Sequence, residues 1–106
     1  MATSDKSRVA LGQWGERRVA RHYESAGYVV VDLNWRVRGD EIVFCEVKTR
    51  SSGRFGSGFE AVDERKQRFL RRTAMSWLDV HGHRGRLRFD VATVTGPRIE
   101  IIEAAF

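Results

Sequence analysis

Glu46 and Lys48 are the residues of this 106-residue chain whose types and spacing most directly suggest chemistry. They lie in residues 41–50, EIVFCEVKTR, where β-branched and aromatic residues are typical of a strand. Side chains alternate between the two faces of a strand, so Glu46 and Lys48 share a face with Ile42 and Phe44. Charged groups beside core residues are costly to bury unless they are paired or bind a metal. Function is one common reason to tolerate that cost.

A carboxylate and a lysine at this spacing suit metal-assisted cleavage of phosphodiesters. Mg²⁺ prefers oxygen ligands and keeps several waters, so one or two carboxylates and a phosphate oxygen can hold it. The metal lowers the pKa of a bound water, and a neighbouring lysine can orient or deprotonate that water. The Glu-x-Lys pattern is nevertheless common by chance, and a surface ion pair is its commoner explanation.

The pattern of residues 8–26 predicts a helix. An apolar stripe recurs at every fourth position, in Leu11, Gly15, Val19 and Tyr23. Glu16 borders this stripe, which makes it a candidate for a second acidic site residue. The alternative, slightly favoured by the sequence alone, is a surface glutamate that pairs with Arg17 or Arg21.

The rest of the chain alternates strand and helix patterns. We expect a strand over 28–35, a polar link over 36–40, the strand 41–50, and a Gly/Ser-rich loop over 51–58. A second helix over 59–80 and two strands over 86–95 and 98–103, joined by a turn, complete the pattern. This order predicts a single α/β domain, residues 1–106, with a mixed β-sheet flanked by helices.

Composition favours a polyanionic partner. The net charge is +5 and the pI about 10.1, which suits nucleic acid or an acidic membrane surface. No apolar run is long enough to cross a bilayer and no signal peptide is recognisable, so we expect a cytoplasmic protein. The histidines form no convincing metal cluster.

Basic residues near the middle strands are candidates for binding DNA phosphates. They are Arg36, Arg38, Arg50, Arg54 and Lys66. Lys66 borders the apolar face of the second helix and is expected to point toward Glu46. For the arginines on the other face of that helix, a solvated surface is as good an explanation as DNA contact.

Several short motifs together resemble the YraN-like family, whose members look like Holliday-junction resolvases of the restriction-endonuclease-like superfamily. The matching stretches are residues 12–16 (GQWGE), 26–28 (AGY), 34–36 (NWR), 44–50 (FCEVKTR), 55–56 (FG), Lys66, Ala74, 88–91 (RFDV) and 105–106 (AF). The resemblance implies a restriction-endonuclease-like fold with a Mg²⁺ or Mn²⁺ site. In that site Glu46 would be a metal ligand, Lys48 the catalytic lysine and Glu16 a further acidic member.

The chain departs from this family between residues 36 and 42. Relatives carry a Gly-Glu-Ile-Asp-Leu-like strand there, and its aspartate is the principal metal ligand. Here residues 36–39 run directly into Asp40, which lies about 20 Å from Glu46 along a straight strand and is a poor replacement. The short link suits an antiparallel hairpin, whereas the family's arrangement leaves the flanking strands parallel. Either the sequence omits residues of the natural polypeptide, which we favour, or this homologue has lost the strand.

The sequence thus predicts a metal-dependent endonuclease that acts on DNA, with branched DNA as a candidate substrate. The alternative is a non-catalytic nucleic-acid-binding module with a degenerate nuclease centre, and a protein-interaction module is a weaker third option. By analogy with resolvases, which act on two-fold symmetric junctions, a homodimer is expected.

Overall fold

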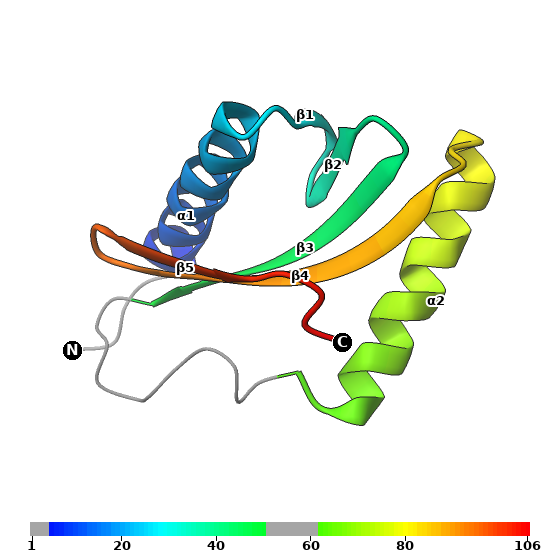
Figure 1. The fold of residues 1–106 in the computed structure, drawn as a ribbon. Helices are drawn as coiled ribbons and strands as arrows, with labels where there is room; N and C mark the ends of the chain where they lie inside the picture. Colours follow the sequence, from blue (N-terminus) through cyan, green and yellow to red (C-terminus); the bar gives the residue numbers. More distant parts are fainter. Residues whose placement is uncertain (1–4, 51–61) are drawn as a thin grey trace.

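The computed structural model describes residues 5–50 and 62–106, in which five strands form one sheet in the order β1-β2-β3-β4-β5. Helices α1 and α2 lie on opposite sides of this sheet (Figure 1). The predicted mixed α/β architecture is therefore confirmed. The elements are α1 (Asp5–Ser25), β1 (Val29–Asp32), β2 (Trp35–Arg38), β3 (Glu41–Arg50), α2 (Glu64–His81), β4 (Arg86–Thr95) and β5 (Arg98–Ile102).

Helix α1 packs closely on β3 because its apolar stripe carries a glycine. Gly15, Val19 and Tyr23 are all buried, as the fourfold spacing predicted. A Cβ atom at Gly15 would lie 1.9 Å from Oγ1 of Thr49, so only glycine leaves room for β3 at this crossing. The helix ends at Ser25, and Gly27 follows with a φ of 92°, which suits the helix stop expected there.

The predicted strand over residues 28–35 is wrong, because two short strands and a turn take its place. The Asp32 side chain accepts a hydrogen bond from the backbone N–H of Leu33 at 2.8 Å, a local bond that favours a turn. Asn34 then adopts a φ of 68°, in the left-handed region that asparagine tolerates. The chain reverses here, and Trp35–Arg38 becomes β2 instead of the expected polar link.

Strands β2 and β3 form an antiparallel hairpin, so most of the residues expected to link two strands form a strand themselves. Arg38 pairs with Glu41, so only Gly39 and Asp40 form the turn. Because β2 supplies the middle strand of the β1-β2-β3 meander, the order becomes α-β-β-β-α-β-β. The strand is filled by Trp-Arg-Val-Arg and carries no acidic residue. That the natural polypeptide contains additional residues here stays a prediction.

Strands β3 and β4 are parallel, and α2 lies in the connection between them. The helix begins at Glu64, after an N-cap Asp63 whose side chain accepts from the Lys66 N–H at 2.8 Å, and not at residue 59 as expected. The β4–β5 hairpin through Gly96 and Pro97 is confirmed, although β5 ends at Ile102. The expected Gly/Ser-rich loop lies outside the described residues.

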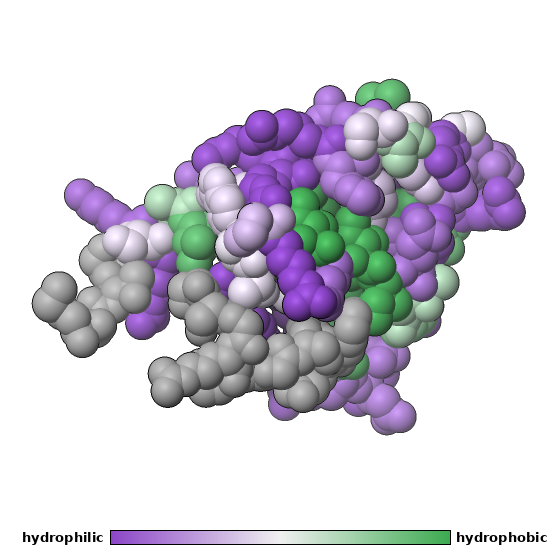
Figure 2. Space-filling model, turned by 60° about the vertical axis from the view of Figure 1, so that its left-hand side comes forward, coloured by the Kyte–Doolittle hydropathy of each residue, from purple (hydrophilic) through white to green (hydrophobic). Residues whose placement is uncertain are grey.

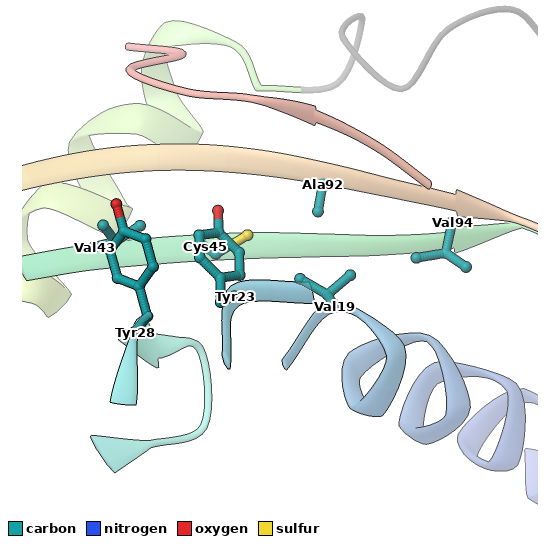
Figure 3. Close-up of a cluster of buried hydrophobic side chains, with 7 residues drawn as sticks. All are labelled: Val19, Tyr23, Tyr28, Val43, Cys45, Ala92 and Val94. Carbon is teal, nitrogen blue, oxygen red and sulfur yellow. The ribbon is translucent and has the colours of Figure 1, made fainter. Parts of the chain in front are cut away.

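Each face of the sheet has its own apolar core. Figure 3 shows the cluster under α1, where side chains from the helix meet those of β3 and β4; it contains Val19, Tyr23, Tyr28, Val43, Cys45, Ala92 and Val94. The cluster under α2 contains Trp35, Ile42, Phe44, Leu70, Ala74 and Phe89. Residues of β3 thus alternate between the two cores, which fixes the direction of every side chain on this strand.

The surface is mostly hydrophilic. Figure 2 shows one face, on which hydrophobic side chains gather near the middle and hydrophilic ones surround them. Phe69 on α2 is an exposed large hydrophobic residue, with 55% of its surface accessible. In the described ranges neither helix is long and apolar enough to cross a membrane.

Candidate nucleic-acid and metal site

Glu46 and Lys48 lie on the α2 face of β3, one strand period apart. The faces follow from the cores, because Ile42 and Phe44 pack against α2 while Val43 and Cys45 pack against α1. Both charged residues are partly buried, and the Glu46 side chain is 22% exposed. The structure thus places Glu46 and Lys48 on one face of β3, as the strand period of two predicted.

Lys66 brings a second amine to this place from α2. Its Nζ lies 3.7 Å from Oε1 of Glu46, which is ion-pair distance. Since Lys66 is in the first turn of α2, the Asp63 cap that starts the helix also positions this lysine. We call Glu46, Lys48 and Lys66 the β3–α2 cluster; the expected direction of Lys66 is confirmed.

The electrostatics of the β3–α2 cluster act on Lys48. Burial lowers the pKa of Lys48, and the positive charges of Arg50 and Lys66 lower it further, whereas Glu46 opposes them. A burial penalty and like charges both disfavour the ammonium form. Lys48 is therefore closer to losing its proton than an ordinary lysine, which suits proton transfer.

Glu16 lies elsewhere. Helix α1 covers the opposite face of β3, and Glu16 lines a cleft of about 400 Å³ between this helix and the β1–β2 hairpin, together with Asn34 and Arg36. The structure therefore places Glu16 and Glu46 on different sides of the sheet.

The predicted phosphate-binding arginines differ in their surroundings. Arg36 is only 2% exposed and lies over the Tyr23 ring, 5.2 Å from its centroid. Arg38 is exposed, donates to the carbonyl of Ala26 at 3.0 Å and pairs with Glu41 at 3.8 Å. Arg50 ends β3, next to the β3–α2 cluster. Arg54 lies outside the described residues.

Glu46 is the hard oxygen ligand that the β3–α2 cluster offers to a divalent cation. Across residues 5–50 and 62–106, no three or more His, Cys, Asp or Glu side chains gather where they could hold a metal ion. Asp40 pairs with Arg86 at 3.3 Å at the other end of β3 and does not contribute. Glu46 fits Mg²⁺ or Mn²⁺ in one way only, namely when phosphate oxygens and waters complete the coordination.

A buried polar network on the α1 face was missed by the sequence reasoning. Asp90, fully buried on β4, accepts from Arg88 Nε and Nη2, both at 2.8 Å, and from the Tyr23 hydroxyl at 2.6 Å. Arg88 also bonds to Glu41, which accepts from Tyr28. The hydrogen bond to Asp90 is the largest cause of a raised pKa of Arg88, and Tyr28 adds to it. The sequence signal for this network was an Arg and an Asp two positions apart in an apolar strand. This is the same spacing of one strand period that separates Glu46 from Lys48.

Comparisons with known proteins identify relatives over nearly the full chain. The UPF0102 protein of Frankia casuarinae is 45% identical over 117 residues, covering 95% of this chain and 99% of the relative. The UPF0102 protein of Frankia alni is 42% identical, and the match covers 95% of this chain and 98% of the relative. That of Acidothermus cellulolyticus is 36% identical over 132 residues and covers all of both chains.

These aligned lengths of 117 and 132 residues exceed the 106 residues of this chain, so the relatives carry residues with no counterpart here. The model of the uncharacterised protein family UPF0102 matches residues 15–94, from the Gly15 crossing through β3 and α2 to β4. The protein therefore belongs to the UPF0102 family, the YraN family that its sequence motifs resemble.

Proposed function

We propose that this protein is a metal-dependent nuclease that binds DNA through the β3–α2 cluster and cleaves phosphodiesters there. One observation carries the proposal: Glu46 lies one strand period from Lys48 and 3.7 Å from Lys66, so an acid and two amines meet on one partly buried face. The resemblance of the sequence to restriction-endonuclease-like proteins supports it.

The two amines of the β3–α2 cluster attract and orient a DNA phosphate. Lys66 is already in the first turn of α2, and its ion pair with Glu46 opens when a phosphate replaces the carboxylate as its partner. Glu46 is then available as an oxygen ligand. A bound Mg²⁺ or Mn²⁺ would polarise the phosphate and lower the pKa of a coordinated water.

Lys48 acts on the attacking water during hydrolysis. In this reaction a water oxygen attacks phosphorus and the bond from phosphorus to the leaving sugar oxygen breaks. Burial lowers the pKa of Lys48, so its amine is poised to take a proton from that water or to orient it. Without the amine, we expect cleavage to fall by about 100-fold or more.

The test compares cleavage and binding in matched variants. Lys48→Met and Glu46→Gln are assayed on labelled branched and linear duplexes with Mg²⁺ or Mn²⁺, next to Arg84→Met. Arg84 is exposed just before β4, at the opposite end of the parallel pair from Lys48, so it controls for the loss of one charge. We expect cleavage to be lost in the first two variants only; equal activity in all proteins would contradict the proposal.

A second candidate is a non-catalytic DNA-binding module. The observation that favours it is that the described part of the chain provides one carboxylate at the cluster and no group of three or more metal-binding side chains. This candidate predicts salt-dependent DNA binding, weakened by Lys48→Met, with no cleavage under any metal. Binding without cleavage by the wild type would select it over the nuclease.

A further inference from the structure

Arg36 is a buried cation, and in the described part of the chain two of its three guanidinium nitrogen atoms lack hydrogen-bond partners. Its residue exposure is 2%, and among the described residues neither Nε nor Nη1 has a hydrogen-bond partner. The Tyr23 ring, 5.2 Å from the guanidinium carbon, offers a cation–π contact but accepts no such bond from these nitrogens. A buried donor without a partner destabilises the fold, and a charged donor does so more strongly. The site is therefore unsatisfied as it stands.

An unpartnered acceptor lies in the same place. Asn34 Oδ1 is buried and has no partner within the described ranges, and both Asn34 and Arg36 line the cleft of about 400 Å³ between α1 and the β1–β2 hairpin. The turn before β2 positions both residues, since Asn34 lies in the turn with a φ of 68° and Arg36 lies two positions further along, on β2. The cleft thus offers donors and an acceptor at once.

The charges of the cleft argue against an anionic ligand. Its lining contains two cations, Arg17 and Arg36, and two carboxylates, Glu16 and Asp32, so that the formal charges cancel. A phosphate would gain from the arginines and lose to the carboxylates. A neutral group that both accepts and donates hydrogen bonds suits this lining better, and Val30 and Leu33 supply apolar wall.

We propose that this cleft binds an unpaired nucleobase of the DNA, with Arg36 donating to base oxygen or nitrogen acceptors and Asn34 Oδ1 accepting from a base N–H. Bases combine acceptors and donors on one planar edge, and arginine paired with guanine is the commonest specific contact of this kind. A base stacked in a duplex exposes only its groove edges and cannot enter a cleft, so the ligand is a base that is unpaired or extruded from the stack. The proposal rests on the proposed function, because it takes DNA as the partner, and it narrows the substrate to DNA with an unpaired nucleotide.

The test separates the contribution of the base to the binding affinity from that of the phosphates. Two fluorescent duplexes are compared by anisotropy in EDTA, which prevents cleavage: one carries a single bulged guanosine and the other an abasic residue at the same position. Their phosphate charge is the same, so any difference in affinity comes from the base. We expect the guanosine bulge to bind the wild type at least about tenfold more tightly.

Three variants locate the effect. Arg36→Met and Asn34→Gly remove the unpartnered groups, and glycine tolerates the positive φ of Asn34. Arg21→Met is the control, because Arg21 is exposed on α1 and is absent from the cleft lining. We expect the guanosine preference to disappear in the first two variants and to persist in the third. Thermal melts verify folding, and Asn34→Gly keeps the test decisive if Arg36→Met does not fold.

The outcomes separate the two proposals. Equal, salt-dependent binding of both duplexes to the wild type would overturn the base site and leave the proposed function standing. A guanosine preference that survives in folded Arg36→Met or in Asn34→Gly would also overturn it. If neither duplex binds at any salt concentration, the proposed function fails and the base site fails with it.

Discussion

Lys48 is the residue whose environment makes the most direct prediction about DNA binding. Burial lowers its pKa, and neighbouring Arg50 and Lys66 lower it further. The amine therefore loses its positive charge at a lower pH than a lysine in water. Arginine at the same position would keep its charge, since a guanidinium does not lose its proton in this range.

We predict that the DNA affinity of the wild type begins to fall at a pH below 10.5, the ordinary pKa of lysine, whereas that of Lys48→Arg falls much less. The sign follows from the lowered pKa: protonated Lys48 attracts phosphate, and raising the pH removes that charge first. Anisotropy titrations without metal measure this. A parallel fall in both proteins would show that Lys48 does not hold the phosphate.

Cys45 makes a second prediction at the level of one side chain. It is fully buried in the cluster under α1, and burial raises its pKa to about 11. The thiolate is the reactive form of cysteine, so both burial and the raised pKa suppress its reaction.

We predict that iodoacetamide at about pH 8 leaves Cys45 unmodified in the folded protein and alkylates it fully in denaturant. Intact mass spectrometry measures the modification. Helix α1 covers Cys45 where it packs on β3. Rapid alkylation of the native protein would therefore mean that this packing opens readily.

The packing of α1 on β3 depends on Gly15 and not on Gly12, three residues earlier in the same helix. A Cβ at Gly15 would lie 1.9 Å from Thr49 Oγ1 and 3.0 Å from both Thr49 Cβ and Cγ2, so rotating the hydroxyl would not relieve the clash. A Cβ at Gly12 would meet no atom within 4 Å. The same substitution therefore has opposite effects three residues apart.

We predict that Gly15→Ala lowers the free energy of unfolding by about 1–3 kcal/mol, because it separates the helix from the strand. Gly12→Ala should raise it by up to about 1 kcal/mol, since alanine favours a helix over glycine. Urea denaturation followed by circular dichroism measures both. Equal effects of the two variants would contradict the close crossing at Thr49.

The network around Asp90 joins segments that are far apart in the chain. The Asp90 carboxylate accepts from Arg88 on β4, from the Tyr23 hydroxyl on α1 and from the Ala104 N–H after β5, the last at 3.0 Å. Because Asp90 is fully buried, these bonds replace its hydration. One carboxylate thus links helix α1, strand β4 and the C-terminal segment.

We predict that Asp90→Asn lowers the free energy of unfolding by about 3 kcal/mol, since it leaves the Arg88 guanidinium without its principal charge partner. Asp79→Asn is the matched control, because Asp79 is exposed on α2. Chemical denaturation of both variants measures the difference. A loss at Asp90 no larger than at Asp79 would show that the network contributes little to stability.

Local patterns in the sequence were sufficient to predict the elements whose apolar residues recur with a clear period. The alternation of residues 41–50 predicted the bounds of β3 and the shared face of Glu46 and Lys48, because a strand's period of two is set by its backbone alone. The fourfold stripe predicted α1 in the same way. The split of residues 28–35 was missed, since the turn depends on the Asp32 side chain and a positive φ at Asn34, which no periodicity reveals.

Which residues meet across elements was decided by packing. The sequence suggested one site containing Glu16, Glu46 and Lys48, but α1 packs on one face of β3 and α2 on the other, so Glu16 joins Arg36 while Lys66 joins Glu46. The periods of a helix or a strand determine its own faces and say nothing about the face that an element distant in the chain will cover. That choice depends on burying the two apolar cores at once, which is a property of the assembled fold.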